Sequence, residues 1–228
     1  MSRFRDGVTF YEREYHRLVV DAKRDHVTLL DVFECDDRTY CLGSDEQLQA
    51  LNLAGYSRIT FPLSDNLDFQ QDPSLSSNDI LGDAQELFDG QVTGFTSVVE
   101  NAGHRRTIVV MRKGTGQKPT VDNVKCEIRA LKVAALAHEI GHVDDIEKGI
   151  NWKENIRNMV GSEVYAHHYA CRTMMERSCF FALGLYVDGV AKMMKARSEY
   201  VRIAAEHVVK STEFKQYRAV LRKQKDKW

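Results

Sequence analysis

The sequence predicts an α+β fold: a small mixed sheet with helices in the N-terminal part, a long helix near the middle, and an all-helical C-terminal third. Two observations carry this prediction. Short runs of β-branched and large apolar residues, bounded by turn formers, lie within residues 27–112. Residues 152–225 contain no proline and no strand-like alternation, but several helical patterns. We therefore divide the chain into a sheet-bearing lobe, residues 1–150, and a helical lobe, residues 151–228, that together form one compact unit.

The N-terminal elements follow from local periodicity and turn signals. Apolar residues at helical spacing over residues 10–25 predict an amphipathic helix that lies on the sheet. The same rules place the other elements of this lobe: strands over 27–35, 38–42, 58–63, 91–99 and 105–112, short helices over 44–55 and 79–88, and a polar loop over 64–78. The strand over 105–112 is either an edge along which an extended peptide could lie or an ordinary buried strand.

A long helix is predicted from about Thr120 to Lys148, capped by Thr120 or Asp122 and ended by Gly149. Its inward face is supplied by Ile128, Leu131, Ala135, Leu136 and Val143. Beyond it, helix breaks are expected near Gly161-Ser162, Ser178, Arg197-Ser198 and Ser211-Thr212.

The long helix carries the motif His138-Glu139-Ile140-Gly141-His142. Histidines four positions apart project from one face of a helix, so both imidazoles can reach a single tetrahedral zinc ion. Glu139 points about 100° away from His138 around the helix, which places its carboxylate beside the ion as a general base. The alternative is a pair of satisfied core histidines, with Glu139 on the surface.

A zinc site needs a third protein ligand, and Glu163 is our candidate. Ser162 can cap a second helix on which Glu163, Ala166, His167 and Ala170 share one face. The alanines would let this helix pack close to the first. His167 is the rival ligand; it could equally orient Glu163 or stabilise an oxyanion as a cation.

A second electrophile commonly stabilises the oxyanion in such sites. His167 and Tyr165 are our candidate catalytic residues beside Glu139, and Tyr169, Tyr186 and His207 are further possibilities for this role. The longer HExxHxxGxxH pattern is absent, because Asp145 and Lys148 stand where glycine and histidine are required.

His138-Glu139-x-x-His142 followed by a helix bearing Glu163 resembles the gluzincin group of zinc metallopeptidases, and the short form is similar to the ImmA/IrrE-like peptidases of phages and bacteria. The likeness covers roughly residues 104–175. It implies His138, His142 and Glu163 as zinc ligands and Glu139 as general base. ImmA/IrrE-like peptidases cleave DNA-binding repressors, so the resemblance implies a regulatory protein as substrate.

Composition limits the setting of this activity. No segment has the apolar length of a membrane span, and the N-terminus lacks the apolar core of a secretory signal. Five cysteines without CxxC spacing fit reduced thiols. We therefore expect a cytoplasmic protein.

Charge changes sign along the chain: acidic residues outnumber basic ones over residues 1–100, and the reverse holds over 188–228. The basic C-terminal helices predict either contact with nucleic acid or an ordinary solvated face. The principal expectation is a zinc-dependent endopeptidase acting on a protein or peptide. The alternatives are a catalytically silent zinc-fold binding protein and a nucleic-acid-binding regulator.

Overall fold

The computed structural model describes residues 3–22, 27–36, 39–42, 58–60, 68–69, 94–101, 104–112, 121–149, 155–196 and 198–224. The chain divides into two compact units, one made of Met1–Val20 with Pro119–Trp228 and the other of Asp21–Lys118. The short helices expected over residues 44–55 and 79–88 lie outside the described residues.

The unit Asp21–Lys118 contributes strands in the order β4-β3-β2-β1-β6-β5. Their bounds are β1 Val27–Asp36, β2 Thr39–Leu42, β3 Arg58–Thr60, β4 Asp68–Phe69, β5 Gly94–Asn101 and β6 His104–Arg112. Strand β6 pairs in parallel with β1 and antiparallel with β5. Because both sides of β6 are paired, it offers no free edge to a peptide, and the expectation of a substrate edge at this strand is wrong.

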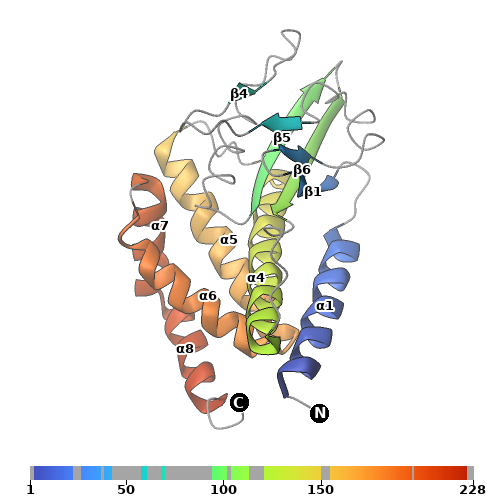
Figure 1. Cartoon of the computed structure of the whole chain (residues 1–228). Helices are drawn as coiled ribbons and strands as arrows, with labels where there is room; N and C mark the ends of the chain where they lie inside the picture. Colours follow the sequence, from blue (N-terminus) through green and yellow to red (C-terminus); the bar gives the residue numbers. More distant parts are fainter. Residues whose placement is uncertain are drawn as a thin grey trace. The chain divides into compact units, whose positions relative to one another are not determined.

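The other unit is all-helical. In Figure 1 this unit is a bundle that combines a helix from the N-terminal end of the chain with helices from its C-terminal half. The described residues of the unit include no strand. The bounds are α1 Arg3–Ala22, α4 Asp122–Glu147, α5 Ile156–Glu176, α6 Phe180–Met193, α7 Glu199–Lys210 and α8 Thr212–Gln224. The α+β class expected from the sequence is therefore wrong for the unit that holds the candidate site, which is an all-helical fold of these six helices.

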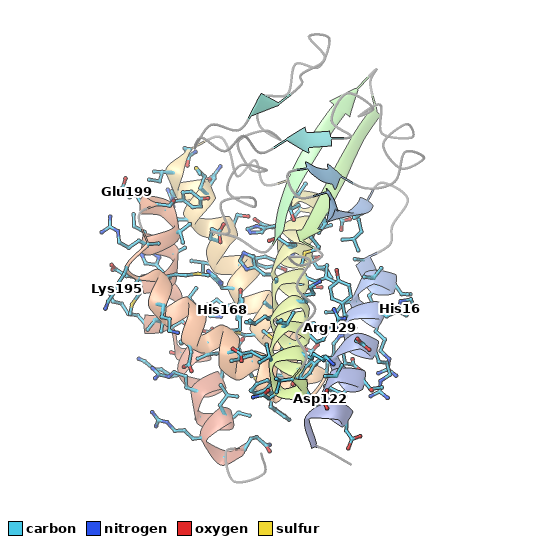
Figure 2. The ribbon with its side chains drawn as sticks, in the orientation of Figure 1. His16, Asp122, Arg129, His168, Lys195 and Glu199 are labelled. Carbon is cyan, nitrogen blue, oxygen red and sulfur yellow. The ribbon has the colours of Figure 1, made fainter. Side chains whose placement is uncertain are left out.

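Helix α1, which we expected to lie on the sheet, packs against other helices of this unit. This packing is the physical reason for the correction. Its buried stripe includes Tyr11 and Leu18, at helical spacing. The Tyr11 hydroxyl accepts a hydrogen bond from the backbone N–H of Ala182 in α6, at 3.3 Å. Arg129 of α4, labelled in Figure 2, donates from Nε to Glu12 Oε1 at 3.0 Å. Helix α1 thus covers other helices with its apolar stripe.

Helix α4 carries the motif and packs against two other helices of this bundle. It begins at Asp122 after Val121, which makes no side-chain capping bond, and Gly149 follows its end with a φ of 82°. Its apolar residues are buried on more than one face, because α5 and α6 both pack against it. They are Ala130, Val133, Ala134, Leu136, Ala137, Ile140 and Val143. Neighbours on two sides therefore fix the position of the helix that carries the motif.

Helix α5 differs from the sequence prediction at its start. The Asn155 side chain caps it by accepting from the Asn158 N–H, so the helix begins at Ile156 and continues through Ser162. The predicted break at Gly161-Ser162 is therefore wrong, whereas the breaks predicted near Ser178 and Ser211 are confirmed, with Ser178 at a φ of 56°. None of the described helices combines the length and the apolar character needed to cross a bilayer.

Candidate metal centre

Three potential ligands converge where α4 and α5 pack side by side (Figure 1). His138 and His142 lie one turn apart on α4, with their Nε2 atoms 3.1 Å apart. From α5, Glu163 places Oε2 at 3.4 Å from His138 Nε2 and Oε1 at 3.6 Å from His142 Nε2. One ligand atom from each residue lies within 4.8 Å of the other two. Two nitrogens and a carboxylate at this spacing can surround one small cation.

Small residues let the two helices approach closely enough for this convergence. Gly141 in α4 faces Ala166 in α5, and both are buried. Any side chain at position 141 would collide with the backbone of α5. The glycine that precedes His142 in the motif therefore allows Glu163 to reach the two histidines.

The electrostatics of the three side chains favour cation binding. Burial lowers the pKa of His142 to about 4, despite the nearby Glu163 carboxylate. For Glu163, burial acts to raise the pKa, but the charges of His142 and His138 and a hydrogen bond from His138 outweigh burial and hold it well below its usual range. For His138, burial acts to lower the pKa, and Glu163 more than compensates, so the pKa is raised. An ionised carboxylate thus faces a neutral His142.

The outer nitrogens of both histidines have hydrogen-bond partners. His142 Nδ1 lies 3.1 Å from Ser162 Oγ, and His138 Nδ1 lies 2.8 Å from the hydroxyl oxygen of Tyr186. Partners of this kind hold an imidazole in one orientation and leave its Nε2 lone pair for a metal. Because Nδ1 is engaged in both rings, the nitrogens available to a metal are the two Nε2 atoms, which face each other and Glu163. The residues present therefore fit a His2Glu zinc site.

Two of these supporting roles escaped the sequence analysis. Ser162 was predicted to be a helix cap, but it lies inside α5 with 1% of its surface exposed. Tyr186, considered for oxyanion binding, lies on α6 with its hydroxyl against His138. The useful signal was the position of Ser162 directly before Glu163, on a helix that packs against His142.

His167 lies one turn beyond Glu163 and is 2% exposed. Its Nδ1 is 2.7 Å from the Tyr186 hydroxyl oxygen, and its Nε2 is 3.9 Å from Glu163 Oε2, too far for a hydrogen bond. Burial lowers the pKa of His167 to about 3, so it is a neutral imidazole. A neutral imidazole does not supply the cation considered in the sequence analysis.

The remaining candidates divide between the site and the surface. Glu139 is 6% exposed. The alternative of two satisfied core histidines placed Glu139 on the surface, where it does not lie. Tyr165 donates its hydroxyl to Asp144 and accepts from Lys148, so the described contacts of its hydroxyl lie away from the three ligands. Tyr169 packs its ring 6.3 Å from that of Tyr165, and His207 is exposed on α7.

Comparison of the chain with protein-family models, curated proteins and solved structures finds no match.

Proposed function

We propose that this protein is a zinc-dependent endopeptidase that hydrolyses peptide bonds of a protein substrate. The observation that carries the proposal is the convergence of His138, His142 and Glu163 from two packed helices, within 4.8 Å of one another. The HExxH motif that contains the two histidines also carries Glu139, a carboxylate that a purely structural site does not need. The likeness of the motif to gluzincins supports the same conclusion.

In this proposal His138, His142 and Glu163 would hold zinc, which would supply Lewis-acid chemistry by polarising a carbonyl and lowering the pKa of water. Glu139 takes a proton from the attacking water and later passes it to the leaving amine. Ser162 holds the His142 ring in place through Nδ1.

The base is tested with Glu139→Gln, which keeps the shape of the side chain and removes its ability to accept a proton. Full-length protein loaded with zinc is incubated with a peptide library made from a bacterial proteome, and mass spectrometry reads the new termini. We expect Glu139→Gln to retain zinc and to lose at least about a hundredfold in cleavage rate. The control Glu176→Gln changes an exposed residue of α5 and should cleave normally. Equal cleavage by Glu139→Gln and the unmodified protein contradicts the proposal.

The third ligand is tested by metal content. Glu163→Ala should lose zinc, measured by mass spectrometry of the purified protein, whereas Glu176→Ala on the same helix should keep it. A Glu163→Ala protein with a full complement of zinc would reject Glu163 as a ligand and leave His167 as the remaining rival.

We infer a cytoplasmic setting and a regulatory protein as substrate. The first inference is supported by the free thiols of Cys126, Cys171 and Cys179. The second is supported by the likeness of the motif to ImmA/IrrE-like peptidases.

Nucleic-acid binding is a second candidate function, favoured by the exposed face of α8. Lys215, Arg218, Arg222 and Lys223 are all exposed along this helix. If they contact phosphates, binding to a DNA duplex should weaken steeply as salt is raised. Absence of binding at low salt rejects this function and leaves the peptidase proposal unchanged.

A further inference from the structure

Two buried polar residues lie behind the metal ligands, and the peptidase chemistry described above does not use them. Tyr186 comes from α6 and His167 from α5, and both are buried. The Tyr186 hydroxyl oxygen lies 2.8 Å from His138 Nδ1 and 2.7 Å from His167 Nδ1. The other nitrogen of His167 lies 3.9 Å from Glu163 Oε2. Hydrogen bonds thus join His138 to His167 through Tyr186, and a gap of 3.9 Å separates His167 from the second metal ligand, Glu163.

The hydrogen atoms along this path can be placed by elimination. When His138 offers its Nε2 lone pair to a metal, its Nδ1 carries the hydrogen and donates to Tyr186. The Tyr186 hydroxyl hydrogen is then free to be donated to His167 Nδ1. His167 Nδ1 accepts that hydrogen as a lone pair, so the hydrogen of its neutral ring is on Nε2, directed towards the Glu163 carboxylate. If His167 carried a hydrogen on both nitrogens, the Tyr186 hydroxyl would face two N–H donors. Its own hydrogen would then have no acceptor among these groups.

We propose that Tyr186 and His167 form a buried relay that links His138 to Glu163 and holds both in the geometry that binds zinc. In this relay they are positioning residues. The inference rests on the proposed zinc site and assigns the residues that organise it.

The relay also explains a buried imidazole nitrogen beside Glu163 that lacks a hydrogen bond. His167 Nε2 is fully shielded and has no hydrogen-bond partner within 3.5 Å. A donor in this position needs an acceptor, because a buried polar group without a hydrogen bond destabilises the folded protein. Glu163 Oε2 is the nearby carboxylate oxygen, and a shift of a few tenths of an ångström or more on metal binding would bring it closer to hydrogen-bond distance.

The same geometry argues against oxyanion binding by Tyr186. Its hydroxyl already donates to one histidine and accepts from another. Turning towards a substrate would break both hydrogen bonds and leave two buried imidazole nitrogens without partners.

The first test is Tyr186→Phe, which removes only the hydroxyl. Zinc affinity is measured in the full-length protein by competition with a chromophoric chelator, and cobalt is substituted to record its visible spectrum. We expect a loss of affinity of about tenfold to a hundredfold and an altered tetrahedral cobalt spectrum, as for other residues that orient metal ligands. Tyr217→Phe removes a hydroxyl from a buried tyrosine of α8 and should change neither measurement. Affinity and spectrum equal to those of Tyr217→Phe overturn the relay.

The second test reads the hydrogen positions directly. Nitrogen-15 NMR of the zinc-loaded protein should show His138 with its hydrogen on Nδ1 and His167 as a neutral ring with its hydrogen on Nε2. A hydrogen on Nδ1 of His167 overturns the relay. Because this measurement uses the unmodified protein, it holds even if a variant fails to fold. His167→Asn keeps an oxygen that can accept from Tyr186, so it should retain more zinc affinity than His167→Leu; equal affinity of the two contradicts the role of His167.

These measurements separate the relay from the peptidase function. If the unmodified protein binds no zinc, both proposals fail. If it binds zinc but cleaves no peptide, the relay is still decided by the affinities and the NMR signals. If it binds zinc and cleaves, but Tyr186→Phe behaves like Tyr217→Phe, the relay alone is wrong.

Discussion

A Cβ atom built on Gly141 would lie 2.8 Å from the Cα of Ala166 on the neighbouring helix. Separations this short essentially never occur for real Cβ atoms, so α4 and α5 are in backbone contact at this point. Gly141 directly precedes His142, and Ala166 lies three residues after Glu163. The distance between the two helices at this contact therefore sets the distance between the carboxylate and the imidazoles.

Gly141→Ala should separate the helices and weaken both folding and metal binding. The added methyl meets backbone, which cannot rotate away, so the free energy of unfolding should fall by about 1–3 kcal/mol. Zinc affinity should fall as well, because Glu163 moves with α5. Urea denaturation and chelator competition measure the two effects.

The matched control is Gly189→Ala in α6, where an added Cβ meets nothing within 4 Å. There the substitution should raise stability by about 0.5–1 kcal/mol, because alanine loses less entropy than glycine in a helix. Equal effects at the two glycines would show that the close contact between α4 and α5 is unimportant.

Ser162→Ala should lower zinc affinity by about tenfold, because it removes the partner of His142 Nδ1 and frees the imidazole to rotate. Chelator competition in the full-length protein measures the loss.

Ser211→Ala is the comparison for this substitution. The Ser211 hydroxyl accepts from the Phe214 N–H and donates to the Val208 carbonyl. Its removal should cost about 1 kcal/mol of stability as a lost helix cap, with unchanged zinc affinity. A Ser162→Ala protein that keeps full zinc affinity would reject the role of this hydroxyl.

Tyr165→Phe should leave peptide cleavage and zinc affinity within about twofold of the unmodified protein. The Tyr165 hydroxyl is engaged by Asp144 and Lys148, and Lys148 is exposed, so stability should fall by at most about 1 kcal/mol. Steady-state kinetics provide the test: a fall in kcat of a hundredfold at constant KM would make Tyr165 the oxyanion donor instead.

Alkaline pH should destabilise the protein through its buried thiols. Burial raises the pKa of both Cys171 and Cys179 to about 12, whereas an unfolded thiol ionises near pH 8.5. The folded pKa lies above the unfolded one, so the stabilisation is complete below about pH 8.5 and is lost as pH rises towards 12.

Urea denaturation between pH 7.5 and 10.5 checks this expectation. Above pH 9 the free energy of unfolding should fall by about 1 kcal/mol per pH unit for each of these thiols. Cys171→Ala should reduce the slope of the free energy of unfolding against pH by the contribution of one thiol, about 1 kcal/mol per pH unit. This expectation holds whatever the substitution does to absolute stability. Identical slopes in both proteins would mean that ionisation of Cys171 is not linked to unfolding.

Local patterns predicted the long helix that carries the motif and the second helix that carries Glu163, because helix periodicity is written into neighbouring residues. These patterns failed where one kind of residue suits two different structural positions. Ser162 resembles a cap because serine favours helix starts, but a small hydroxyl residue also suits a tight helix contact, and here the contact prevails. The helix α1 has an apolar stripe that fits a sheet or a bundle equally well.

The sequence alone determined that His138 and His142 share a helix face with Glu139 beside them, because four residues make about one turn of any α-helix. Only the tertiary structure decided which groups meet that face. Glu163, Ser162 and Tyr186 arrive from α5 and α6, and their approach depends on the packing of whole helices. Such packing is the sum of many weak contacts between distant residues, and no short stretch of sequence records it.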